Sequence, residues 1–121
     1  MAANSVKDTT VYKKAFTLTM EIFQISKQFP AEEKYSLTDE IRRSFKSVCI
    51  CLLEAYRKKI CQAHYVAKVT DSDMENSETS GWLYFAVACK YISNEQCQHL
   101  IDQNAEVGKL LYHMITNPDK Y

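Results

Sequence analysis

Residues 35–59 carry the pattern that most constrains the fold. Apolar side chains recur every three or four residues along this stretch, at Leu37, Ile41, Phe45, Val48, Leu52 and Ala55. Because an α-helix repeats every 3.6 residues, this spacing places them on one side of a helix. Lysines and arginines occupy other positions of the stretch. We therefore expect a long amphipathic helix with one buried side and a positively charged exposed side.

Other segments share this periodicity, and the chain contains only two glycines and two prolines, too few for a fold rich in tight turns. We predict helices at about Thr9–Gln28, from Ser36 to between Lys58 and Cys61, at about Cys61–Tyr91, and from Ser93 to Asn117. Four such helices with short connections predict an all-α, antiparallel up-and-down four-helix bundle. The bundle would span residues 9–117, with a flexible N-terminus at 1–8 and a C-terminal tail at 118–121.

Local signals indicate where the helices begin and end. Pro30 ends the first, because proline lacks an amide hydrogen. Ser36 is a candidate N-cap of the second, and Ser93 with Gln96 forms an S-x-x-Q capping box for the fourth. Gly81 predicts a close approach between helices. The segment WLYFAVACKYI at 82–92 is apolar nearly all round, which predicts the most buried part of its helix.

The formal charges sum to zero but divide unevenly. Residues 1–70 carry a net charge of +5, and residues 71–121 carry −5. This separation favours steering of an anionic partner or pairing between copies, and it is equally compatible with charges that pair within one bundle. Five cysteines without a C-x-x-C pair indicate reduced, mostly buried thiols in a cytoplasmic protein. No apolar run approaches the ~18 residues of a membrane span, so we expect no membrane partner.

The acidic and histidine residues do not predict a reaction. A di-metal bundle needs a Glu-x-x-His pair on each of two helices, and Glu95 to His99 is one residue too long. No nucleophile elbow or phosphate-binding glycine loop is present. We therefore expect no enzyme activity, no metal and no cofactor, with a bundle metalloprotein as the remote alternative. The acids Glu54, Glu75 and Glu78 are expected to be structural polar partners, the last two across helices or with Arg42 or Arg43.

Two basic clusters are candidates for binding RNA or DNA. They are Arg42, Arg43 and Lys46 in one cluster, and Arg57, Lys58 and Lys59 at the end of the second helix. Tyr56 and Tyr65 lie near the second cluster and could stack on bases. Cations at a helix C-terminus also complement the helix dipole, which is the purely structural alternative.

The first and third predicted helices are apolar over more than one face. Tyr12, Phe16 and Phe23 form a second stripe beside the main seam of the first helix. A single small bundle buries about one broad face per helix, so surplus apolar surface predicts a partner. Self-association is the simplest way to cover it.

The order of several sequence blocks resembles a known bacterial family. The blocks are VYKKAFTLTMEIFQISKQFP (11–30), YSLTDEIRRSFKSV (35–48), EAYRKK (54–59) and ETSGWLYFAVACKYIS (78–93). They are similar to the four-helix bundle proteins encoded in intervening sequences of 23S ribosomal RNA genes. In this family, a glycine is common at the position of Lys90, asparagine at Cys51, and glycine at Ala55.

The resemblance implies a homopentameric bundle without established enzyme activity. It also implies similarity to the accessory variability protein of diversity-generating retroelements, a basic pentamer that binds a reverse transcriptase and nucleic acid. Ile41, Arg42 and Arg43 match the I-R-R of the family. The sequence thus predicts a non-enzymatic, oligomeric accessory protein that binds RNA or DNA through its basic patch, or alternatively a scaffold for a protein partner.

Overall fold

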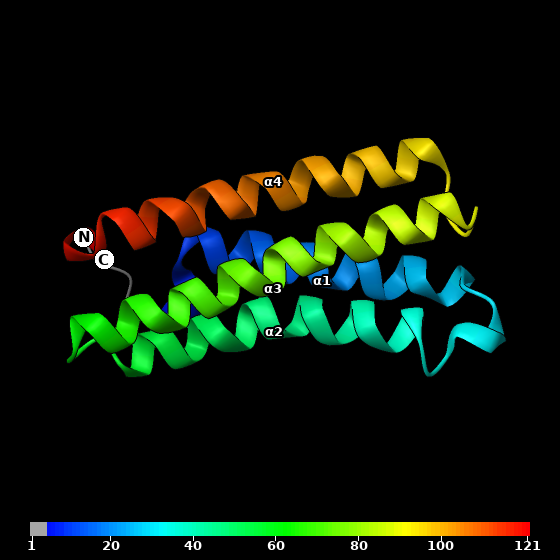
Figure 1. Cartoon of the computed structure of the whole chain (residues 1–121). Helices are drawn as coiled ribbons and strands as arrows, with labels where there is room; N and C mark the ends of the chain where they lie inside the picture. Colours follow the sequence, from blue (N-terminus) through cyan, green and yellow to red (C-terminus); the bar gives the residue numbers. More distant parts are fainter. Residues whose placement is uncertain (1–4) are drawn as a thin grey trace.

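Residues 5–121, the part of the chain described by a computed structural model, form four long helices that run alternately up and down (Figure 1). The helices are α1 (Thr10–Ile25), α2 (Leu37–Arg57), α3 (Gln62–Ala88) and α4 (Asn94–Thr116). Short 3-10 helices flank them: η1 (Val6–Asp8), η2 (Ser26–Gln28), η3 (Ala31–Glu33) and η4 (Pro118–Lys120). No strand occurs within residues 5–121. The predicted all-α, antiparallel four-helix architecture is therefore confirmed.

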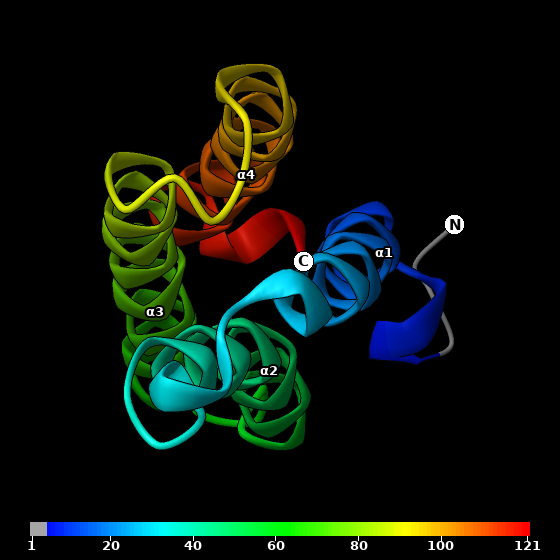
Figure 2. The same cartoon turned by 90° about the vertical axis from the view of Figure 1, so that its right-hand side faces the viewer.

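The four helices enclose one core. Figure 2 shows them around a common centre in chain order, so that each helix contacts the next and α4 contacts α1. The apolar positions predicted for residues 35–59 all lie in this core: Leu37, Ile41, Phe45, Val48, Leu52 and Ala55 are each no more than 6% exposed. The helical periodicity thus identified the buried side of α2 correctly. Among residues 5–121, no helix has both the length and the apolar character needed to cross a membrane.

The helix ends agree with the sequence in some places and depart from it in others. Thr9 caps α1 through a 3.2 Å bond from the Tyr12 amide to its Oγ1. The capping box of Ser93 and Gln96 is present as predicted. The Ser36 cap is not: its side chain accepts no capping bond, and the Leu37 amide donates instead to Glu33 Oε1 at 3.5 Å.

Two helices end about three residues earlier than predicted. Helix α1 ends at Ile25, and the chain continues as the 3-10 helix η2 before it reaches Pro30. Helix α3 ends at Ala88, where the amides of Lys90 and Tyr91 donate to the carbonyls of Val87 and Ala86 in a Schellman arrangement. Lys90 has a φ of 63°, the left-handed conformation that favours glycine.

The segments outside the four helices also pack. The predicted flexible N-terminus at 1–8 lies partly outside the described residues, but from Ser5 onward it forms η1 and buries Val6. The tail at 118–121 forms η4, and the Tyr121 hydroxyl bonds with His113 Nδ1. Both segments lie at the bundle end where α2 leads into α3 (Figure 1).

The middle of α3 buries polar side chains. Ser72 donates to the Val48 carbonyl at 2.8 Å, and the hydroxyls of Ser44 and Thr79 are 3.0 Å apart. Facing α4, Asn76 Nδ2 donates to Asn104 Oδ1 at 2.7 Å. Small hydroxyl and amide groups therefore join α3 to both of its neighbours, and each is hydrogen-bonded, as burial requires.

Asn104 also donates two hydrogen bonds to α3. Its Nδ2 donates to the Asn76 carbonyl at 2.8 Å and to Ser80 Oγ at 2.7 Å. Asn76 is 6% exposed and Asn104 is 1% exposed. A shift of α4 along α3 would break this pairing inside the core, so the two amides fix the register of the two helices.

The expectation that residues 82–92 form the most buried part of α3 was wrong. Leu83, Ala86 and Ile92 are buried, but Tyr84 is 57% and Phe85 is 60% exposed. The reason is geometric. Helices α2 and α4 contact only one side of α3, and buried polar side chains in the middle of α3 keep that side turned toward them. The apolar residues on the other side remain uncovered in the single chain.

The close approach predicted at Gly81 was also wrong. A Cβ added at Gly81 would meet no atom within 4 Å, whereas one added at Gly108 would lie 3.0 Å from Asn76 Oδ1. Gly108 is therefore the residue that lets α4 approach the buried amide of α3.

We predict different effects for alanine at the two glycines. Gly81→Ala should stabilise the fold by about 1 kcal/mol, because alanine has the higher helix propensity and meets open space. Gly108→Ala should be less stable than Gly81→Ala by about 1–3 kcal/mol, because the new methyl group disturbs a buried hydrogen-bonded amide and this cost opposes the same gain in helix propensity. Urea unfolding of both variants measures the difference. Equal stabilisation by both would show that Asn76 can move without cost.

We also predict that Lys90→Gly stabilises the fold by about 1 kcal/mol, since glycine adopts a positive φ without the steric cost of a Cβ. Lys90→Ala is the control, because it removes the charge and keeps the Cβ. Thermal unfolding should show a higher melting temperature for the glycine variant alone. A similar rise for alanine would assign the effect to the lysine charge.

Candidate interaction surfaces

Arg43, one of the predicted nucleic-acid contacts, is held by carboxylates on two helices. Its Nη1 lies 3.2 Å from Glu75 Oε2, and its Nη2 lies 2.9 Å from Glu78 Oε1 and 3.6 Å from Glu40 Oε2. Desolvation disfavours the guanidinium charge, but the attraction of the three acids outweighs it, so the pKa of Arg43 is raised. A phosphate would have to compete with three carboxylates for this side chain.

Arg42 and Lys46 border a small apolar groove between α1 and α2. Arg42 Nε donates to Ser26 Oγ at 2.7 Å, and its guanidinium lies 4.7 Å from the centre of the Phe23 ring. The groove has a volume of about 210 Å³. Its lining is Phe16, Thr19, Met20, Ile22, Phe23, Arg42, Phe45 and Lys46. We call it the α1–α2 groove; its wall is apolar and its edge is cationic.

Large apolar side chains are exposed on each of the four helices, and α1 and α3 carry more of them than α2 and α4. On α1, Phe16, Met20 and Phe23 are 50%, 44% and 38% exposed. On α3, the exposed residues are Met74, Tyr84 and Phe85, which we call the α3 apolar face. The second stripe of the first helix was the sequence signal for the α1 residues, but Met20 was not singled out by that stripe.

The second basic cluster lies where α2 ends. Arg57 is the last residue of α2, and Lys58 and Lys59 follow it, all three exposed. Lys59 Nζ lies 4.1 Å from the centre of the Tyr56 ring and 5.9 Å from that of Tyr65. Burial lowers the pKa of Lys59.

The prediction that Tyr65 could stack on bases was wrong. Tyr65 is 2% exposed, and its hydroxyl has no hydrogen-bond partner within residues 5–121. Burial raises the pKa of this phenol. Tyr56 remains partly exposed, and Tyr121 of the tail lies near it at the edge of a cleft of about 380 Å³. We call this cleft, at the start of α1 and the end of α2, the end cleft.

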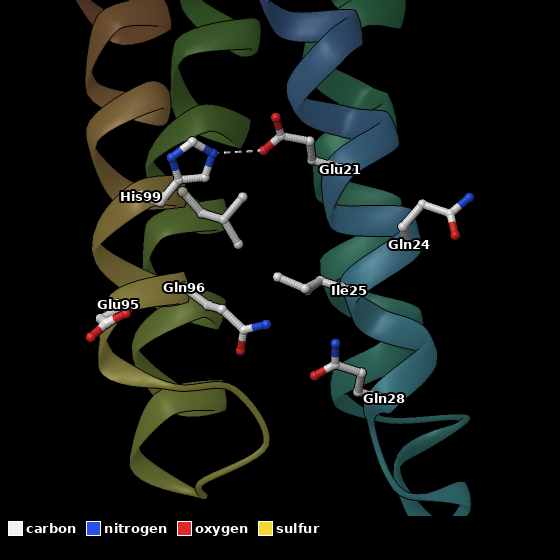
Figure 3. Close-up of a pocket in the computed structure, with 8 residues that line it drawn as sticks. Glu21, Gln24, Ile25, Gln28, Glu95, Gln96 and His99 are labelled. Atoms are coloured by element: carbon white, nitrogen blue, oxygen red, sulfur yellow. Dashed lines mark hydrogen bonds and ion pairs between the residues drawn. The ribbon is translucent and has the colours of Figure 1, made fainter.

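A larger cleft of about 510 Å³ lies between the C-terminal end of α1 and the N-terminal end of α4 (Figure 3). His99 Nε2 on α4 lies 3.2 Å from Glu21 Oε2 on α1, and Gln103 contacts the same nitrogen at 3.0 Å. Figure 3 shows Ile25 directed into the cleft and Gln24 directed away from it. The cleft thus offers one histidine–carboxylate pair and amide groups, without a nucleophile beside them.

The remaining predicted acid contacts another helix. Glu54 pairs with Lys68 at 3.3 Å rather than with the basic residues at the end of its own helix, and Asp71 lies 3.7 Å from the same lysine. Within residues 5–121, no group of three or more histidine, cysteine, aspartate or glutamate side chains is placed to hold a metal ion.

The thiols differ in burial. Cys49 and Cys97 are buried, and burial raises the pKa of both. Cys51 and Cys61 are half-buried and Cys89 is exposed, so the prediction of mostly buried thiols holds for two of the five. The cysteines are free in the described part of the chain.

Comparison with known proteins identifies relatives over most of the chain. Residues 7–113 match the model of a family described as "23S rRNA-intervening sequence protein". A crystal structure of a protein of unknown function from the S23 ribosomal protein family of Bacteroides thetaiotaomicron VPI-5482 is similar, with a TM-score of 0.80 and 26% sequence identity. The similarity covers 88% of this chain and 98% of that one. No match was found among curated protein sequences.

Proposed function

The chain belongs to the 23S rRNA-intervening sequence protein family, and from this premise we propose that it is a non-enzymatic bundle that assembles with copies of itself. The observation that carries the proposal is the exposure of large apolar side chains on two separate faces, the α1–α2 groove and the α3 apolar face. Isolated exposed apolar residues are normal, but clustered ones on a monomer usually mark an interface.

Charge favours contact between unlike faces. Arg42, Lys46 and Lys27, whose Nζ lies 5.1 Å from the Phe23 ring centre, surround the groove with positive charge. Asp71 and Asp73 precede the exposed Met74 on α3, in the half of the chain with net charge −5. A groove on one copy would therefore receive the α3 apolar face of the next. Such heterologous contacts form rings when the rotation closes, and a five-membered ring is what family resemblance implies.

We predict that the protein sediments as a multiple of its 14.0 kDa chain mass. Phe16→Ser and Phe85→Ser should each weaken association roughly tenfold or more, because each removes an aromatic ring from the contact. Ile60→Ser is the control, since Ile60 is 99% exposed and lies in the α2–α3 turn. Sedimentation velocity across a dilution series provides the measurement.

A mixture of the two phenylalanine variants tests the unlike-face arrangement directly. Each variant retains one intact face, so the mixture should form heterodimers that neither variant forms alone. Rings that persist in both variants, or a wild-type protein that stays monomeric at all concentrations, would reject the proposal. Circular dichroism establishes that each variant is folded.

Binding of RNA or DNA is the second candidate function, and one observation favours it. Lys46, Arg57 and Lys58 are exposed and have no carboxylate within ion-pair distance among residues 5–121. They are therefore available for phosphates, whereas Arg43 is engaged by acids. A protein-binding scaffold is the remaining alternative if nucleic acid does not bind.

We predict RNA affinity that falls with salt, with a logarithmic slope of about −0.7 to −0.9 per phosphate contact. Arg57→Ala and Lys58→Ala should each reduce the slope by about one contact. Arg43→Ala, which removes the same charge, should leave it nearly unchanged because its guanidinium is already paired. Fluorescence anisotropy with labelled RNA at several salt concentrations measures these slopes, and an absence of binding at low salt would reject the nucleic-acid function.

A further inference from the structure

The end cleft combines positive charge with aromatic surface in one half-open cleft. Its lining residues come from η1 and the start of α1, the end of α2, the last turns of α4 and the C-terminal tail. Lys59 and Lys120 supply the cations, and Tyr56 and Tyr121 supply aromatic rings. Its volume of about 380 Å³ falls in the range of sites that hold small organic groups, roughly 300–1,000 Å³.

Lys59 is a cation without a counter-ion. Its ammonium lies over the Tyr56 ring at 4.1 Å, and no carboxylate lies within ion-pair distance of it among residues 5–121. The tyrosine ring holds the charge in place without neutralising it. An anionic group that enters the cleft would therefore gain an unshared partner. Asp8 is the only carboxylate side chain in the lining, and it opposes such a group.

The other walls suit a flat apolar ring. Val11, Leu110 and Met114 form an apolar floor. Tyr121 is 39% exposed and is oriented by the bond between its hydroxyl and His113 Nδ1. Anion and ring together are the chemistry of a nucleotide.

We propose that the end cleft binds one nucleotide of a single-stranded nucleic acid, with its phosphate on Lys59 and Lys120 and its base against Tyr121. This inference rests on the proposed nucleic-acid function and makes it specific. A base can enter the cleft only when it is unstacked and unpaired, so the site selects single strands over duplexes. Arg57 and Lys58, which immediately precede Lys59, would contact the neighbouring phosphates.

The experiment compares a labelled single-stranded RNA with the duplex of the same sequence by fluorescence anisotropy at low salt. The single strand should bind at least tenfold more tightly. Lys59→Ala should weaken single-strand binding about fivefold or more, and Tyr56→Leu should do the same while Tyr56→Phe retains affinity, because the Tyr56 ring and not its hydroxyl holds the Lys59 ammonium in place. Asp8→Asn should tighten binding, because it removes the opposing charge.

The opposite end of the bundle supplies matched controls. Lys34 Nζ lies 5.3 Å from the centre of the Tyr35 ring, a similar lysine–tyrosine pair on an 85% exposed tyrosine that does not line the end cleft. Lys34→Ala and Tyr35→Leu should leave the affinity unchanged. Thermal unfolding checks each variant, and Lys59→Ala and Asp8→Asn keep the test decisive if Tyr56→Leu does not fold.

The outcomes separate the two proposals. If neither RNA binds, the nucleic-acid function fails and the end cleft fails with it. If the duplex binds as tightly as the single strand, or if the variants at the two ends behave alike, nucleic-acid binding stands and the end cleft is rejected. Competition by a free nucleoside monophosphate that Lys59→Ala abolishes would support the cleft.

Discussion

The polar middle of α3 is the constraint on which the rest of the molecule depends. Ser72, Asn76 and Thr79 are buried only because each finds a partner on α2 or α4, and an unpaired amide or hydroxyl in that position would cost about 1–3 kcal/mol. These bonds allow one rotation and one register of α3. In that rotation, Met74 and Phe85 face away from the core. The exposed apolar surface of α3 is thus a consequence of the hydrogen bonds that its buried polar side chains make in the core.

The same register determines which charges are available. With α3 fixed against α2, Glu75 and Glu78 lie beside Arg43, so the most central arginine of the basic helix is neutralised inside the chain. The remaining positive charge of this helix lies in two places. Arg42 and Lys46 lie beside the α1–α2 groove, and Arg57, Lys58 and Lys59 lie at the end of α2. Although the formal net charge is zero, the protein therefore has two separate cationic regions, one beside the α1–α2 groove and one at the end cleft.

The sequence correctly predicted features that depend on local patterns, such as the buried side of a helix and its capping box. It did not predict features that depend on residues distant in the chain, such as the exposure of a side chain at one end of α3. The apolar spacing from Leu37 to Ala55 identified the buried side of α2, and Ser93 with Gln96 identified the start of α4, because both signals lie within a few residues. The exposure of Phe85 could not be foreseen, since it depends on which side of α3 its neighbours occupy. Gly81 and Gly108 look alike in sequence, and only the position of Asn76 distinguishes them.

The candidate surfaces show the same division. Clusters of lysine and arginine are visible in the sequence, but the engagement of Arg43 and the burial of Tyr65 arise from tertiary contacts. The two proposals also use different parts of the molecule, since the groove around Phe23 lies away from the bundle end that holds Lys59. A cyclic ring places equivalent points at the same height along its axis, so all of its end clefts would lie at one level. Several weak single-nucleotide sites at that level would then bind one strand with avidity that a single copy lacks.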